Sequence, residues 1–234
     1  MEISLDRHIY WQLGVFKINS TLAMTWVEMA LLVCGAWWAG RLLVQDPTAP
    51  LTRVQNVWES LLTIIRKQVA EIAGEDPAYY FPFVCTMFLF ISVANLLSVV
   101  PGFHSPTASL STTGALAATV MLATPIYGLR RHGVKGYLAH YLQPTPLMLP
   151  FHLLAEVTRT VALSIRLFGN AMSGTLIVGL LLSLVPFFFP ILMQVLELLI
   201  GQVQAYIFAV LTTVYLASAA RVQVPKTNQG ESNG

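Results

Sequence analysis

The sequence predicts an all-α polytopic membrane protein, with five spanning helices and one interfacial amphipathic helix. Of the 234 residues, 56% are hydrophobic and only 10% are charged, whereas ordinary soluble domains carry about 25% charged residues. The apolar residues gather in runs that match or exceed the roughly 20 residues needed to cross a bilayer. Since little sequence remains outside these runs, we expect one membrane domain over residues 1–234.

The N-terminal third is predicted to contain the first span and the surface helix. Residues 1–20 form a mixed-charge segment, and residues 21–44 form a span with three tryptophans, longer than a signal-peptide core. Over residues 51–73, apolar side chains recur at helical spacing and charged side chains fill the other face. This pattern predicts an amphipathic helix on the membrane surface, with a short soluble helix packed on a partner as the alternative.

The remainder of the chain is predicted to form two helical hairpins. The first covers residues 81–130 and is followed by a cytoplasmic loop over 131–146. The second covers residues 147–220, and each of its helices would reach about 50 Å, against a hydrocarbon core of about 30 Å. We therefore expect these two helices to be steeply tilted, with a turn at the two prolines of 185–190. Residues 221–234 form a tail.

Basic residues are distributed unequally between the two sides of these spans. Nine Lys and Arg residues fall on one side and two, Arg7 and Lys17, on the other. The positive-inside rule therefore places the N terminus outside and the C terminus in the cytoplasm. The net charge of +2 does not suggest nucleic-acid binding. We find no phosphate loop, serine elbow or metal-ligand cluster, and we predict no catalytic residue, cofactor or metal site.

Arg166 is the most informative polar residue in the predicted spans. A guanidinium stays charged, and at bilayer depth it costs about 3 kcal/mol on insertion scales. No carboxylate lies three or four residues away on its own helix, so its partner must come from elsewhere. Together with the other polar groups at this depth, Arg166 predicts an ion or proton path rather than packing alone.

The helix of Arg166 carries further polar side chains on the same face. Arg159, Asn170 and Ser173 belong to this face, because successive separations are seven, four and three residues. Arg159 also lies three residues from Glu156, and a purely structural ion pair is an equally good interpretation. Interhelical hydrogen bonding is the alternative role for Asn170.

Polar residues in the other spans add to the candidate path. Glu197, Gly201 and Gln204 share a face of the last predicted helix, and Gln204 has interhelical hydrogen bonding as its alternative. His152 lies near a cytoplasmic end, where a solvated histidine is the commoner outcome. Glu28 in the first span faces either a lumen or a buried site, and the sequence favours neither.

Several segments resemble subunit a of F-type ATP synthases. The segment Ser164-Ile-Arg-Leu-Phe-Gly-Asn170 is similar to the central motif of that family, and it precedes a helix that contains Gln204-Ala-Tyr-Ile-Phe208. The resemblance extends in the family's order over most of the chain, and it includes residues 10–14, 86–90, Asn95 and 143–146.

This resemblance implies a non-catalytic stator subunit that couples proton translocation to ATP synthesis or hydrolysis in the bacterial inner membrane. The implied partners are the rotating ring of subunit c, the peripheral-stalk subunit b, the lipid bilayer and a remote catalytic head. Arg166 matches the essential arginine that lies between two aqueous half-channels. The expected ion path contains Asn170, Gln204, Glu197, Glu156, Arg159, Thr175, Ser173, Asn95 and His152.

The chain departs from the family pattern at two places. Thr175 stands where the family often has an acid, and residues 106–113 lack an aspartate that the family often has. The two missing carboxylates also fit a divergent, sodium-coupled branch, so the coupling ion stays open. A secondary ion-coupled transporter is the other alternative.

Overall fold

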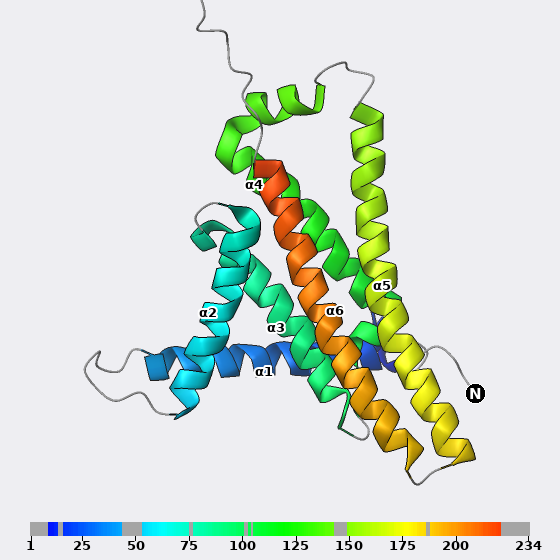
Figure 1. The fold of residues 1–234 in the computed structure, drawn as a ribbon. Helices are drawn as coiled ribbons and strands as arrows, with labels where there is room; N and C mark the ends of the chain where they lie inside the picture. The colour runs from blue at the N-terminus through cyan, green and yellow to red at the C-terminus, as the bar shows by residue number, and fades with distance from the viewer. Residues whose placement is uncertain are drawn as a thin grey trace, which may run out of the picture.

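The computed structural model describes most of the chain as helix. The described residues are 9–13, 16–43, 53–74, 77–100, 103, 105–142, 149–185 and 188–220. Six α-helices make up nearly all of these ranges (Figure 1). Four of them are long and apolar enough to cross a membrane, and a shorter apolar helix of 17 residues would reach about 25 Å. The predicted all-helical membrane architecture is confirmed.

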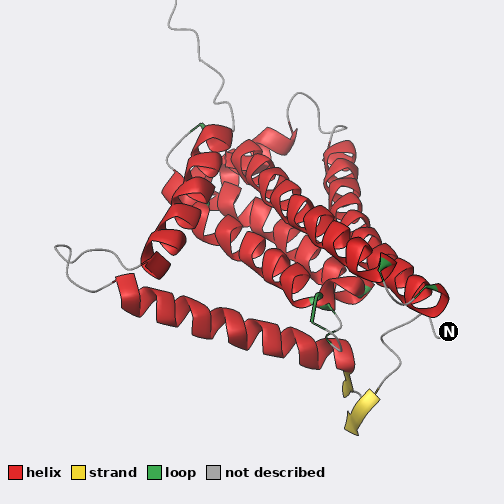
Figure 2. Ribbon diagram, turned by 60° about the horizontal axis from the view of Figure 1, so that its bottom comes forward, coloured by secondary structure: helices red, strands yellow, loops and turns green. Residues whose placement is uncertain are grey.

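A short β-hairpin precedes the first helix, where the sequence analysis had expected only an outer segment. Strands β1 (Ile9–Leu13) and β2 (Phe16–Asn19) pair antiparallel, with Leu13 opposite Phe16. Aromatic and β-branched residues, which favour strands, are frequent in both. The hairpin leads directly into α1 (Ser20–Leu43), and Figure 2 shows it at the end of that helix.

Helix α1 lies across the direction of two long helices, α5 (Leu149–Leu184) and α6 (Phe189–Ala220) (Figure 1). If α1 stands nearly upright in the bilayer, α5 and α6 are strongly tilted from the bilayer normal. This geometry accounts for their lengths of 36 and 32 residues, which far exceed the roughly 20 residues of an upright span.

Helix α2 (Arg53–Ala73) has the amphipathic character predicted for residues 51–73. Val69 and Ala73 are buried against the other helices, while Arg66 and Lys67 are exposed. The side-chain hydroxyl of Tyr206 on α6 donates a hydrogen bond to Gln68 at 2.9 Å, which ties α2 to the long hairpin.

Helices α3 (Phe81–Leu97) and α4 (Leu110–Leu142) are joined through a short helix, η3 (Pro106–Ala108). The loop predicted over 131–146 is wrong in its first part, because α4 remains helical as far as Leu142. A break at Gly133 redirects the helix there, with φ of 70° and ψ of 166°. Glycine lacks the Cβ that makes a positive φ unfavourable, so the chain turns at this point and resumes as helix.

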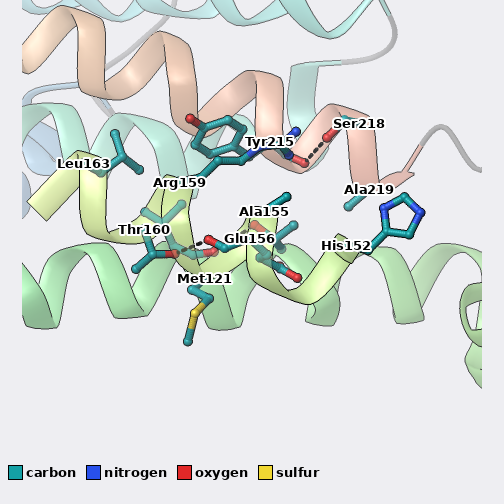
Figure 3. A pocket seen from close by; sticks show the side chains of 12 residues that line it. Met121, His152, Ala155, Glu156, Arg159, Thr160, Leu163, Tyr215, Ser218 and Ala219 are labelled. Carbon is teal, nitrogen blue, oxygen red and sulfur yellow. Dashed lines mark hydrogen bonds between the residues drawn. The ribbon is translucent and has the colours of Figure 1, made fainter. Parts of the chain in front are cut away.

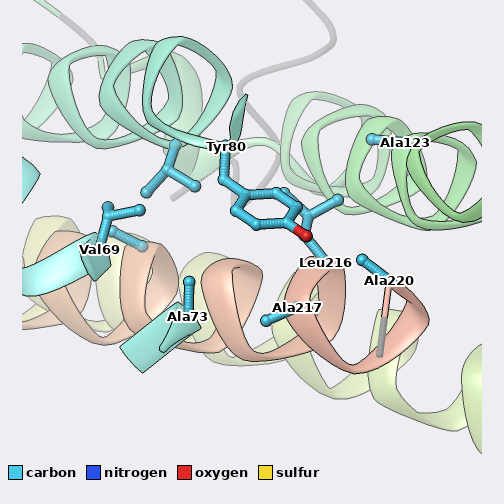
Figure 4. Close-up of a cluster of buried hydrophobic side chains, with 9 residues drawn as sticks. Val69, Ala73, Tyr80, Ala123, Leu216, Ala217 and Ala220 are labelled. Carbon is cyan, nitrogen blue, oxygen red and sulfur yellow. The ribbon is translucent and has the colours of Figure 1, made fainter. Parts of the chain in front are cut away.

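The core lies where α3, α4, α5 and α6 meet. One buried cluster includes Ile91, Leu163 and Phe208, and a second surrounds the fully buried ring of Tyr80 between α2, α3, α4 and α6 (Figure 4). The Tyr80 hydroxyl also accepts a hydrogen bond from Arg131 at 3.1 Å. These contacts fix the inner face of the long hairpin, and the described residues of the chain leave much of its outer face exposed.

Polar groups join α3 to α6 at three levels. The Asn95 amide donates to the carbonyl of Gly201 at 2.7 Å, and Ser92 and Gln202 exchange two hydrogen bonds of 2.6 and 3.0 Å. Gln194 donates to the carbonyl of Val99 at 3.1 Å. We call these contacts the α3–α6 clamp. Because hydrogen bonds are directional, the clamp fixes both the rotation and the height of α6 against α3.

Candidate ion path

Arg166 lies on the outer face of α5. Its neighbours Leu163 and Leu167 are buried against the core, whereas Arg166 and Ile165 are exposed. Within the described part of the chain, no hydrogen bond or ion pair joins Arg166 to another residue. A permanent positive charge at membrane depth therefore points away from its own subunit, toward whatever covers this face.

A cavity of about 220 Å³ lies between α4, α5 and α6, on the N-terminal side of Arg166 along α5 (Figure 3). We call it the α4–α5–α6 cavity. It brings together three predicted path residues, His152, Glu156 and Arg159. The Arg159 guanidinium lies 5.3 Å from the ring centre of Tyr215, a cation–π distance that keeps the charge at the cavity wall.

A second, smaller cavity of about 80 Å³ lies between α5 and α6, on the C-terminal side of Arg166. We call it the α5–α6 cavity. It brings together the predicted residues Asn170, Ser173 and Glu197. Among the described residues that line it, Glu197 is the only ionisable one.

Gly174 allows the Glu197 carboxyl to lie against α5. A Cβ built at Gly174 would collide with the end of the Glu197 side chain, so only glycine leaves the carboxyl its present place. The sequence analysis missed Gly174, although two adjacent small residues, Ser173 and Gly174, are a signal for close helix approach.

The two cavities flank Arg166 along α5. The lining of the α4–α5–α6 cavity ends at Leu163, and the lining of the α5–α6 cavity begins at Asn170. Arg166 thus occupies the interval between them, on the exposed side of the same helix.

Three predicted path residues lie outside both linings. Asn95 is buried in the α3–α6 clamp, where its amide holds Gly201. The Thr175 hydroxyl donates to carbonyls of its own helix, at Ala171 and Met172. Gln204 is buried, and its Nε2 atom has no hydrogen-bond partner within the described ranges.

The sequence analysis placed Glu197, Gly201 and Gln204 on one face of the last helix. In the structure, however, these residues have different neighbours. Glu197 borders the α5–α6 cavity, whereas Gly201 packs against Asn95 of α3. The side chain of Asn95 lies so near Gly201 that a Cβ there would be 2.8 Å from its Cγ atom. Gly201 is therefore a contact point between helices, and it is not among the described residues that line either cavity.

Known proteins resemble the chain over its whole length. The family model for the ATP synthase A chain matches residues 22–217. ATP synthase subunit a 2 of Picosynechococcus sp. is 52% identical over 226 residues, which cover 97% of this chain and 96% of the relative. ATP synthase subunit a 2 of Acaryochloris marina is 50% identical over 222 residues, or 95% of this chain and 94% of the relative. ATP synthase subunit a of Albidiferax ferrireducens is 46% identical over 235 residues, the full length of both. The chain therefore belongs to the subunit a family of F-type ATP synthases, as its motifs had indicated.

Proposed function

We propose that this non-catalytic membrane subunit passes protons through two half-channels that Arg166 separates. The α4–α5–α6 cavity serves as the cytoplasmic half-channel, and the α5–α6 cavity serves as the outer half-channel. One observation carries this assignment: Arg166 is exposed on α5 in the interval between the two cavities, without a partner in the described part of its own chain.

The missing partner of Arg166 is supplied by the subunit c ring. A ring carboxyl that arrives opposite the guanidinium is favoured in its ionised form, so it releases its cation on one side and accepts another after passing. Arg166 itself does not carry protons, because a guanidinium does not deprotonate at working pH. Each charge that crosses contributes about 2.3 kcal/mol per 100 mV of membrane potential.

The outer face of α5 and α6 is the surface that meets the ring. Val161 and Ile165 of α5 and Leu196 and Leu199 of α6 are exposed apolar side chains of this hairpin. Such a surface suits either lipid or the apolar helices of a ring, and only the ring supplies a counter-charge. Subunit b and the catalytic head complete the assembly.

The charge asymmetry of the sequence supports a defined orientation. With the N terminus outside and the C terminus in the cytoplasm of a bacterial inner membrane, the turn between α5 and α6 lies outside. The α5–α6 cavity then lies toward the outer side and the α4–α5–α6 cavity toward the cytoplasm. We assign His152, Glu156 and Arg159 to the cytoplasmic route and Asn170, Ser173 and Glu197 to the outer route.

Substitution of Arg166 tests its proposed role as the fixed charge between the two half-channels, which we call the gate. Arg166→Ala should abolish ATP synthesis driven by an ion gradient, and Arg166→Lys should reduce it severely, because a mobile ammonium does not reproduce the fixed guanidinium. Synthesis is measured in membrane vesicles, per assembled complex, with Arg66→Lys on the exposed face of α2 as the control. Near-normal synthesis in Arg166→Lys vesicles contradicts the proposal. Repeating the assay with a sodium gradient in place of the proton gradient identifies the coupling ion.

A further inference from the structure

Glu28 of α1 is a buried carboxyl without a partner. Its exposed fraction is 0%, and neither carboxyl oxygen has a hydrogen-bond partner among the residues that the structure describes. Buried polar groups are nearly always hydrogen-bonded, because an unsatisfied one is strongly unfavourable. Glu28 therefore requires a ligand that the described part of this chain does not provide.

The position of Glu28 limits what this ligand is. A lipid headgroup or a side chain of another subunit approaches from the surface, where α1 presents Trp26, Met29 and Ala30. Glu28 has no exposed surface at which such a group is met. Only a very small ligand reaches a site of this kind, and a carboxylate selects a cation. The ligand is thus a proton or a small monovalent cation.

The segment around η3 supplies a polar route from α1 toward the long hairpin. Helix α1 packs against η3, and α5 packs against the same short helix. The segment is buried throughout and rich in hydroxyls, which is unusual for a connection between two membrane helices. We call Ser105, Thr107, Ser109 and Thr113 the η3 hydroxyl cluster.

Hydrogen bonds extend the η3 hydroxyl cluster to α5. Ser105 and Thr107 share a hydrogen bond of 2.7 Å, and Thr113 donates to the carbonyl of Ser109 at 3.2 Å. The Ser164 hydroxyl of α5 then donates to Thr113 at 3.5 Å. Ser164 lies two residues from Arg166 along α5, so the hydroxyls reach the helix that carries the gate.

We propose that Glu28 is a cation-binding site at the outer entrance of the ion path, and that the η3 hydroxyl cluster leads from its helix to α5. Glu28 lies about 12 Å along α1 from its first residue, which is the outer half of the membrane in the proposed orientation. When the ion is a proton, a hydronium ion gives it up as an O–H bond forms at the carboxylate, and that bond breaks when the proton passes to a water molecule on release. No electron transfer or further reactant is involved. The placement on the outer side rests on the proposed function.

Passive conduction through membranes stripped of the catalytic head tests this site. Glu28→Gln keeps the size of the side chain and removes its negative charge. It should slow conduction per assembled complex about tenfold or more, the factor that corresponds to losing one charge-assisted contact. Glu59→Gln on the exposed face of α2 is the matched control and should conduct normally. Flux is measured separately under a proton gradient and a sodium gradient, and slowing of either supports the site. Wild-type flux of both ions in Glu28→Gln overturns it.

A thiol test covers the case in which Glu28→Gln fails to assemble. Glu28→Cys and Ala30→Cys are made in a chain with Cys34→Ser and Cys85→Ser, and the membranes are treated with Ag⁺, a thiol-binding monovalent cation small enough for a site without exposed surface. Conduction should be blocked at position 28 and not at position 30, which faces outward on the same helix. Equal response at the two positions overturns the site. These outcomes leave the gate untouched, since only the Arg166 variants test that proposal.

Discussion

At the scale of single residues, Glu197 has the clearest chemical role to test. Thr175 stands where the family often has an acid, and Glu197 is the only carboxyl among the described residues that line the α5–α6 cavity. Glu197→Gln keeps hydrogen bonding but removes proton exchange. We expect passive proton conduction through head-stripped membranes to fall sharply, because a relay needs a group that binds and releases the proton. Wild-type conduction would show that the passage is merely polar and water-filled.

Gly174 offers a second test of the same cavity that leaves every ionisable group in place. Gly174→Ala places a methyl group where the Glu197 carboxyl now lies, so the flexible side chain must move aside. We expect slower conduction with normal assembly. Gly179→Ala is the matched control on the same helix, because nothing lies within 4 Å of a Cβ at that position. Equal conduction in the two variants would mean that the position of the carboxyl is unimportant.

At the scale of helices, the α3–α6 clamp predicts that Asn95 and Gly201 depend on each other. Gly201→Ala alone should destabilise the packing of α3 on α6 by about 1–3 kcal/mol, the usual cost of overpacking. Asn95→Ala removes the atoms that the new methyl group would meet, so it should relieve part of this cost in the double variant. The midpoint temperature at which the detergent-solubilised complex loses subunit a measures all three variants. Strict additivity would contradict the contact.

The sequence pattern predicted where most helices begin and end. It did not predict which helices contact one another. The amphipathic helix predicted over 51–73 is observed as Arg53–Ala73, and the hairpin predicted over 147–220 is observed as α5 and α6. Apolar runs and prolines carry this information locally. Helix continuation beyond 131 was missed, because the break at Gly133 looks in sequence like the start of a loop.

The candidate site was predicted only in part for a similar reason. Arg166, Glu197 and Asn170 stand out because polar groups at membrane depth are rare. Asn95 is equally polar, yet its side-chain amide donates a hydrogen bond to the Gly201 carbonyl in the α3–α6 clamp. Such a difference depends on which helix packs against which face, and a single sequence contains no direct record of those distant contacts.

At the scale of the whole molecule, the proposed orientation predicts which ends of the helices are accessible from each side. In a chain with Cys34→Ser and Cys85→Ser, Phe188→Cys at the turn before α6 should react with a membrane-impermeant reagent in spheroplasts, where the outer face of the inner membrane is accessible. Glu59→Cys on α2 should react only in inverted vesicles. Both positions are exposed in the structure. The opposite pattern would reverse the assignment of the two half-channels.

The unequal size of the two cavities has a consequence for throughput. An ion that crosses must use both passages one after the other, as current passes through two resistors in series. When two passages are crossed in series, the narrower passage sets the overall rate of ion flow. The α5–α6 cavity holds about 80 Å³, and the α4–α5–α6 cavity holds about 220 Å³. For the proposed half-channels, we therefore expect supply from the outer side to limit how fast the ring is fed during synthesis, and the wider cytoplasmic cavity to add little delay.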